Sequence, residues 1–182
     1  MKTLAFALLL LLPSAPSRSP GDPKIENTSY VAPDGSRVLR QSVLVRASLR
    51  EAWDAFTTTE GVRAWAVPVA QVDFRLGGIW ESSYDPSAKI GDPANIRNKF
   101  IAFVPLRMVA IQAIQAPPGF RNLELLPEIF HVIDLEEAGE GNVRVTISGV
   151  GYRSGEGFDA LYAHFEKGNA WTLGKLQRRF AE

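Results

Sequence analysis

Residues 48–65, SLREAWDAFTTTEGVRAW, decide how this chain folds. Ser48 and Glu51 form a capping box, in which the hydroxyl and the carboxylate satisfy the first free amides of a helix. The apolar residues of this segment lie on one helical face: Leu49, Ala52, Trp53 and Phe56. The residues Thr57-Thr58-Thr59-Glu60 repeat the capping pattern and predict a second short helix that ends near Trp65. Two short helices are therefore expected in succession.

Extended segments precede and follow this helix pair. Residues 38–45 are rich in branched side chains and predict a strand before it. Six strand-like runs follow it: 69–76, 79–84, 96–104, 108–115, 129–136 and 143–152. Gly77-Gly78 separates the first two runs by the two residues of a tight hairpin, which needs positive φ angles. The whole pattern predicts a long antiparallel meander.

One long helix is expected at the end of the chain. Its core-facing residues recur at helical spacing over about 25 residues, or about 37 Å: Phe158, Leu161, Tyr162, Phe165, Thr172, Leu176 and Phe180. A helix of that length crosses a whole sheet. The predicted fold class is α+β: a curved antiparallel sheet of about six to seven strands wrapped around the C-terminal helix, with two short helices after the first strand.

The N-terminal residues have the pattern of a secretory signal peptide. Lys2 precedes an apolar run from Leu4 to Leu12, and small residues follow up to Ser17. At about 1.5 Å per residue this run covers less than half of a hydrocarbon core of roughly 30 Å, so a stable membrane span is not expected. We expect a signal peptide at 1–17, a linker at 18–36, one domain at 37–182, and a secreted or periplasmic location.

The composition excludes several classes of chemistry. The 182 residues contain 20 basic and 20 acidic side chains, two histidines and no cysteine. Without cysteine there is no disulfide, thiolate nucleophile or zinc–thiolate site, and two histidines leave little for a histidine-rich metal cage. A formal net charge of zero gives no field that gathers phosphates, so no nucleic-acid partner is expected. No metal and no cofactor is predicted.

Several short segments together resemble a known family. They are Arg46-Ala47-Ser48, 51–57, Glu60-Gly61 with Trp65, Asp73-Phe74-Arg75-Leu76-Gly77-Gly78 and Gly168-Asn169. This set resembles the START-like, or SRPBCC, helix-grip superfamily, and within it the branch named for the activator of the 90-kDa heat-shock chaperone ATPase. The resemblance covers about 36–180. It implies a mainly apolar pocket between sheet and terminal helix that binds lipids, polyketides, hormones or aromatic ligands, with cyclase or hydrolase activity in some members.

Seven residues are expected to line that pocket: Trp65, Trp80, Tyr84, Phe100, His131, Phe165 and Asn169. The resemblance favours bulky side chains facing the cavity at Trp65 and Trp80, although large aromatic residues also serve as core filler. Tyr84 shares strand parity with Trp80 and would add a hydroxyl to the cavity. It could equally lie at the end of a strand, exposed to solvent. Phe100 and Met108 are candidate wall residues on strands whose facing is ambiguous.

Polar residues in the predicted interior have two interpretations each. His131 shares parity with Ile129, Ile133 and Leu135, so it faces the helix, where it is either a general base or a hydrogen-bonded core histidine. Gly168-Asn169 interrupts the apolar stripe of the last helix, at a cost of about 1 kcal/mol for the glycine. This break either leaves room for a ligand or lets the helix pack closely on the sheet.

The predicted function is an exported protein that binds a small hydrophobic or aromatic ligand in the cavity between sheet and helix, without catalysis. One alternative is a cyclase- or hydrolase-type enzyme that uses His131 and Tyr84 in the same pocket. The sequence places no serine or aspartate to complete a triad with His131, and no catalytic residue is assigned. The other alternative is a co-chaperone-like protein-interaction module, which export would separate from a cytosolic chaperone.

Overall fold

The computed structural model describes residues 24–181, and the predicted signal peptide at 1–17 lies outside them. The chain begins with β1 (Glu26–Asn27), β2 (Tyr30–Val31) and β3 (Arg37–Arg46), followed by α1 (Leu49–Thr57) and α2 (Thr59–Trp65). The next strands are β4 (Val69–Val72), β5 (Ile79–Ser83), β6 (Ile96–Val104) and β7 (Met108–Gln115). A 3-10 helix, η1 (Leu123–Glu128), leads to β8 (Phe130–Glu137), β9 (Asn142–Tyr152) and α3 (Glu156–Arg179).

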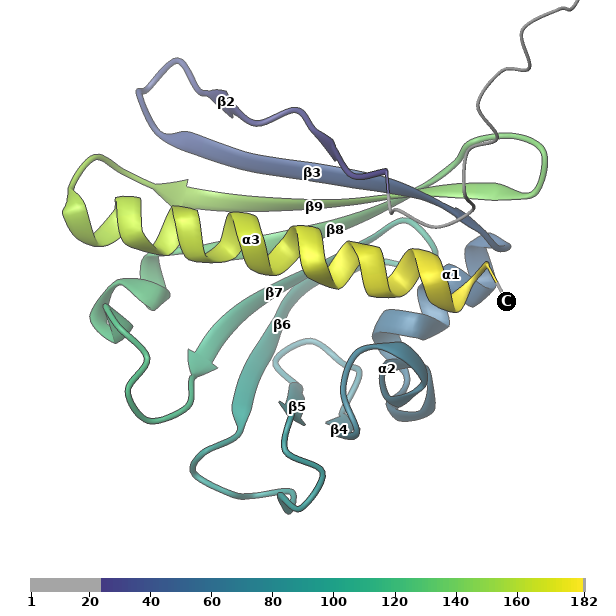
Figure 1. Ribbon diagram of the computed structural model, residues 1–182, viewed down its shortest axis with the longest axis horizontal. Coiled ribbons are helices and arrows are strands. Elements are labelled where there is room, and N and C mark those ends of the chain that lie inside the picture. Colours follow the sequence, from purple (N-terminus) through teal and green to yellow (C-terminus); the bar gives the residue numbers. More distant parts are fainter. Residues whose placement is uncertain (1–23, 182) are drawn as a thin grey trace, which may run out of the picture.

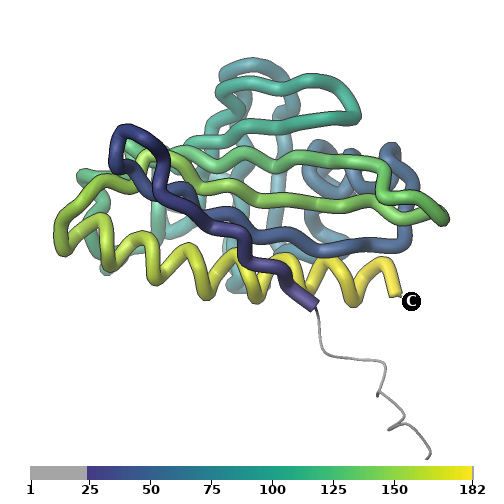
Figure 2. Tube along the Cα trace, turned by 90° about the horizontal axis from the view of Figure 1, so that it is seen from above, coloured from purple at the N-terminus to yellow at the C-terminus, as the bar shows by residue number. Residues whose placement is uncertain are grey.

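All described strands belong to one antiparallel sheet. Its order is β1-β3-β9-β8-β7-β6-β5-β4, and β2 also pairs with β3. The helix α3 lies across one face, and the strands turn from nearly parallel to it at β3 and β9 to steeply inclined at β6 and β5 (Figure 1). Seen from above, α3 runs alongside β3 and β9 for most of its length (Figure 2). This architecture confirms the predicted α+β helix-grip fold.

The segment expected to be a linker contains two short strands. In β1, Glu26 pairs with Ser42, and in β2, Tyr30 pairs with Val38, both on the outer edge of β3. Asn27 Nδ2 also donates to Glu166 Oε1 of α3 at 3.0 Å. Strands of two residues carry too little periodicity to be recognised in a sequence rich in proline and glycine.

The capping signals of 48–65 act as expected. The Glu51 amide donates to Ser48 Oγ at 3.2 Å, and the Ser48 amide donates to Glu51 Oε2 at 2.8 Å. Thr58 caps α2, because its hydroxyl oxygen accepts from the Gly61 amide at 2.9 Å. These caps stop one helix and start the next, so the pair folds back beneath the end of α3, as Figure 1 shows.

The Gly77-Gly78 turn differs from the predicted two-residue hairpin. The strand β4 ends at Val72, so six residues, 73–78, connect it to β5. Of the two glycines only Gly77 has a positive φ, of +77°. Gly78 is required for another reason, because a Cβ there would lie 2.0 Å from the Asp73 carbonyl oxygen.

The side chains of this connection explain why the strand prediction ran too far. Phe74 turns into the core and packs edge-on against Trp53 and Phe100, with ring centroids 5.4 and 5.0 Å away. Leu76 is 65% exposed. The charged residues Asp73 and Arg75 pair with each other at 2.9 Å within this connection. One partly buried and one exposed apolar residue thus imitate the alternation of a strand.

The core consists of two main apolar clusters that α3 connects. Leu173 and Leu176 near the C-terminal end of α3 pack with α1, α2 and the central strands. Phe158 and Leu161 near its N-terminal end pack with Leu39, Leu126, Ile129 and Tyr152. The middle of the helix, at Gly168-Asn169, belongs to neither cluster. The interior is therefore open where these two residues face the sheet.

Candidate functional site

A cavity of about 390 Å³ lies beneath α3, between the two clusters. Its wall is mainly apolar and aromatic, and these lining residues come from the helices, the strands and the loop after β7: Phe56, Trp65, Trp80, Ile111, Phe120, Leu126, Ile133, Ile147 and Phe165. The volume falls within the range of about 300–1,000 Å³ that is usual for small-molecule sites. The cavity is thus large enough for a compact organic ligand.

The structure brings six of the seven predicted site residues to this cavity: Trp65, Trp80, Tyr84, His131, Phe165 and Asn169. The indole nitrogen of Trp65 donates to the Ala55 carbonyl at 2.9 Å, which fixes its ring at the junction of α1 and α2. Trp80 comes from β5 and is partly exposed to the cavity.

Phe100 does not line the cavity. It is fully buried on β6 and packs beneath Phe74, in the cluster with α1 and α2. The further candidate Met108 begins β7 and is also absent from the lining. Both parities of these strands are apolar, so the sequence does not distinguish a core position from a cavity position.

His131 points from β8 toward α3, as its parity with Ile133 and Leu135 predicts. Its ring lies 4.7 Å from the Phe165 ring, and burial lowers its pKa from the usual 6.5 to about 4. Its Nε2 atom is buried and has no hydrogen-bond partner among the described residues. His131 is therefore a neutral imidazole at neutral pH.

A second unpaired polar group lies beside His131. Gly149 is its partner on β9, and a Cβ there would lie 3.0 Å from the Tyr152 hydroxyl oxygen and 3.3 Å from His131 Nε2. The Tyr152 hydroxyl is also buried without a partner in the described part of the chain, and burial raises its pKa above the usual 10. Gly149 thus keeps a small space into which both groups point.

Gly168 and Asn169 open the middle of α3. A Cβ at Gly168 would meet no atom within 4 Å, which rules out close packing against the sheet as the reason for this glycine. The Asn169 side chain is buried, lines the cavity, and has an Nδ2 atom with no partner among residues 24–181. Of the two interpretations of this pair, close packing of the helix on the sheet at Gly168 is thus excluded.

Two half-exposed aromatic rings mark the mouth of the cavity. Tyr84, after the end of β5, is 54% exposed, and Trp171 on α3 is 51% exposed. Their ring centroids lie 5.7 Å apart in an edge-on arrangement. The Lys175 ammonium lies 4.7 Å from the centre of the Trp171 ring and also donates to the Ala66 carbonyl. Tyr84 is thus a residue of the mouth.

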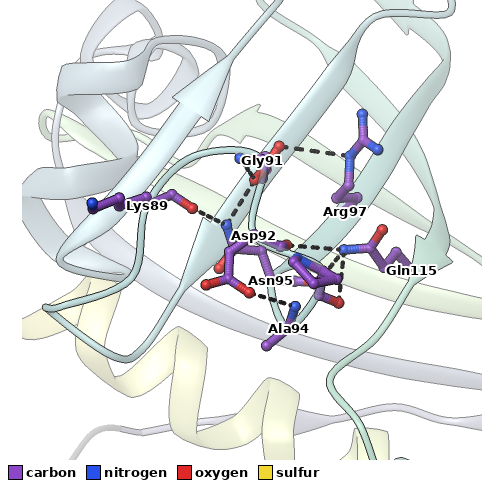
Figure 3. A network of polar contacts seen from close by, with 9 residues as sticks. Lys89, Gly91, Asp92, Ala94, Asn95, Arg97 and Gln115 are labelled. Atoms are coloured by element: carbon purple, nitrogen blue, oxygen red, sulfur yellow. Dashed lines mark hydrogen bonds and ion pairs between the residues drawn. The ribbon is translucent and has the colours of Figure 1, made fainter.

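A buried carboxylate fixes the rim of the cavity. Glu81 accepts hydrogen bonds from the Gly91 amide and from Asn95 Nδ2, at 2.5 and 2.7 Å. The cavity residue Gln115 donates through Nε2 to the Asn95 carbonyl at 2.8 Å, and Arg97 approaches the Glu81 carboxylate at 3.6 Å. Figure 3 shows Asn95, Arg97 and Gln115 gathered around the loop that joins β5 to β6. The loop is thereby held to Glu81 of β5 and to the cavity residue Gln115.

Several residues of the cavity lining were not predicted from the sequence. Phe120 lies in a proline- and glycine-rich connection, where no periodicity indicates the direction of a side chain. Asn98 and Gln115 are polar residues on strands whose parity is ambiguous, and Trp171 lies one position outside the apolar stripe of α3. His164 on α3 also lines the cavity; it is exposed and packs edge-on against Phe120, with ring centroids 5.1 Å apart.

The part of the lining that the described residues form contains no lysine, arginine, aspartate or glutamate. Among residues 24–181 no group of three or more metal-ligating side chains comes together. No helix in the same range has the length and hydropathy needed to cross a bilayer.

The fold is similar to that of several solved structures. CalU16 from Micromonospora echinospora superposes with a TM-score of 0.59 at 16% identity, over 86% of each chain. A chain of the Aha1 dimer from Colwellia psychrerythraea superposes with a TM-score of 0.59 at 17% identity, over 79% of this chain and 95% of that one. An HSP90 activator from Plasmodium falciparum superposes with a TM-score of 0.51 at 13% identity, over 76% of this chain and 90% of that one.

The family comparison covers most of the chain. No curated protein matches the sequence. The family described as "Activator of Hsp90 ATPase homolog 1-like protein" matches residues 46–181, which include the helix pair, the meander and α3. With the helix-grip fold and the cavity beneath α3, this match confirms the resemblance to the SRPBCC superfamily. The chain belongs to the Activator of Hsp90 ATPase homolog 1-like family.

Proposed function

We propose that this chain binds a small hydrophobic or aromatic ligand in the cavity beneath α3 and releases it unchanged. One observation carries the proposal: α3 packs at both ends and leaves about 390 Å³ open at Gly168-Asn169, where a larger residue would have room. A core evolved only for stability fills such a space, because each unfilled methyl-sized void costs about 1 kcal/mol. The aromatic wall supplies the binding energy by burying apolar surface.

The state of His131 supports binding over catalysis. A general base needs a partner that orients it, and no hydrogen bond among the described residues joins His131 to a carboxylate or a hydroxyl. With a pKa of about 4 its imidazole is a weak base at neutral pH. Tyr84, the other residue of the enzymatic alternative, packs against Trp171 at the mouth. These two groups do not form a catalytic pair.

We further propose that the mature chain works outside the cytosol. The N-terminal pattern of Lys2, the run from Leu4 to Leu12 and the small residues up to Ser17 supports this location. The family description and the HSP90 activator from Plasmodium falciparum favour the co-chaperone alternative instead. Export would keep this chain away from a cytosolic chaperone, so the location of the mature protein distinguishes the two functions.

Cleavage after Ser17 gives the first prediction. Protein recovered from its own host is expected in the periplasm or the medium, with Arg18 as its N-terminal residue. Intact-mass spectrometry and N-terminal sequencing of the purified chain measure this. A full-length chain retained in the cytosol would contradict export and favour the co-chaperone alternative.

Blocking the cavity gives the second prediction. The substitution Asn169→Trp places a large side chain where Asn169 lines the cavity, so it is expected to weaken binding of the uncharged probe N-phenyl-1-naphthylamine at least about tenfold. Fluorescence titration measures the affinity. Lys167→Trp is the matched control, because Lys167 lies on the exposed side of the same helix and outside the cavity lining. Equal binding by the two variants, with unchanged thermal stability, would place the ligand elsewhere.

The buried imidazole gives the third prediction. Because the folded chain holds His131 neutral down to about pH 4 while the unfolded chain protonates it near pH 6.5, the unfolded state binds more protons in this window. The folded state therefore loses about 3 kcal/mol of stability as the pH falls from 6.5 to 4. Urea unfolding at several pH values measures this, with His131→Gln as the reference that lacks the titration. If the free energy of unfolding changes with pH in the same way in both proteins, the imidazole is hydrated and this prediction is wrong.

A further inference from the structure

Three side chains of the cavity carry a buried nitrogen without a hydrogen-bond partner among residues 24–181. They are Trp80 on β5, His131 on β8 and Asn169 on α3, with the unpaired atoms Nε1, Nε2 and Nδ2. A buried polar group that makes no hydrogen bond costs about 1–3 kcal/mol, so such groups are rare in folded proteins. Three of them around one cavity indicate that something other than the protein satisfies them.

Two of these atoms can only donate. The indole N–H of Trp80 and the amide NH₂ of Asn169 have no acceptor capacity at those nitrogens. Asn98 is opposite Trp80 in the strand register and also lines the cavity, yet Trp80 Nε1 has no partner among the described residues. The Gln115 amide nitrogen already donates to the Asn95 carbonyl. Two residues that line the cavity, one on the sheet and one on the helix, thus carry donors that no described residue uses.

The charges of the lining restrict the ligand as well. No lysine or arginine among residues 24–181 lines the cavity, and burial keeps His131 neutral at neutral pH. A carboxylate drawn past the mouth, where Lys175 lies beside Trp171, would lose its hydration without meeting a lysine or arginine side chain, which costs several kcal/mol. An ammonium ion would lose its hydration in the same way, because no aspartate or glutamate faces it. Fatty acids and other anions are therefore poor ligands.

We propose that the ligand is an uncharged molecule that presents carbonyl-type acceptors to Trp80 Nε1 and Asn169 Nδ2, with its apolar body against the aromatic wall. The inference rests on the proposed function, and it adds the chemical class of the ligand and the two residues that select it. A hydrocarbon of the same shape leaves both donors unpaired once it displaces the water of the cavity. We therefore expect this site to bind the hydrocarbon more weakly than a molecule of the same shape that carries acceptors.

Three naphthalene probes of similar shape test this inference. 2-Acetylnaphthalene is uncharged and carries a carbonyl, 2-isopropenylnaphthalene replaces that oxygen by a methylene group, and 2-naphthoate is an anion at neutral pH. The ketone is expected to bind the mature chain at least about fivefold more tightly than the alkene, because the alkene leaves both donors buried without an acceptor, at about 1–3 kcal/mol each. The naphthoate is expected to bind at least about tenfold more weakly than the ketone. Calorimetric titration measures all three.

Two variants locate the donors. Trp80→Phe removes only the indole N–H and part of the ring, and Asn169→Leu removes the amide at similar volume. Each is expected to reduce the advantage of the ketone over the alkene to less than about twofold, while Ile111→Val, on the same wall and without a polar group, keeps it. Alkene binding as tight as that of the ketone in the unchanged chain would overturn this inference and leave the proposed function intact. Failure of all three probes to bind would overturn both.

Discussion

The contact between α3 and the sheet is the constraint on which the rest of the structure depends. A single helix of 24 residues spans both apolar clusters, with Phe158 and Leu161 held in one and Leu173 and Leu176 in the other. Between these two ends, the middle of the helix borders the cavity. Gly168 and Asn169 occupy that middle, and they are too small to fill it. The cavity is thus a consequence of which residues α3 carries at its ends and centre.

The surroundings of the cavity keep it open and give it a polar character. Glu81 holds the loop between β5 and β6 through Gly91 and Asn95, so the rim is formed without a ligand. A preformed site loses little conformational entropy on binding. Its interior combines aromatic surface with the unpaired nitrogens of Trp80 and Asn169. An empty cavity of this kind lowers stability, whereas an uncharged ligand with acceptors would recover part of that cost.

Local sequence patterns predicted the elements and most of the site. The caps at Ser48 and Thr58 are short-range signals, and the structure reproduces both. Strand parity placed His131 correctly, because Ile133 and Leu135 on the same parity are buried. Phe100 was assigned to the cavity although it lies in the core, because it shares parity with the lining residues Ile96 and Asn98 but lies further along β6, against Phe74.

Features that depend on tertiary contacts could not be predicted from the sequence. Phe74 looks like part of a strand, yet it leaves the sheet to pack against Trp53. Phe120 reaches the cavity from a connection whose path no local pattern indicates. The unpaired state of Trp80 Nε1 depends on where its neighbours lie, which residue types alone do not specify. Residue types therefore indicated a cavity, and only the fold identified its donors.

Native mass spectrometry of the mature chain purified from its own host tests the central claim most directly. Gentle ionisation preserves a compound held in the cavity, and extraction with organic solvent releases it for identification. We expect one uncharged organic molecule bound to each chain, of a size that fits about 390 Å³, and recovered unchanged. A chain that is empty at every protein concentration tried, and that stays empty with added aromatic ketones, would contradict it.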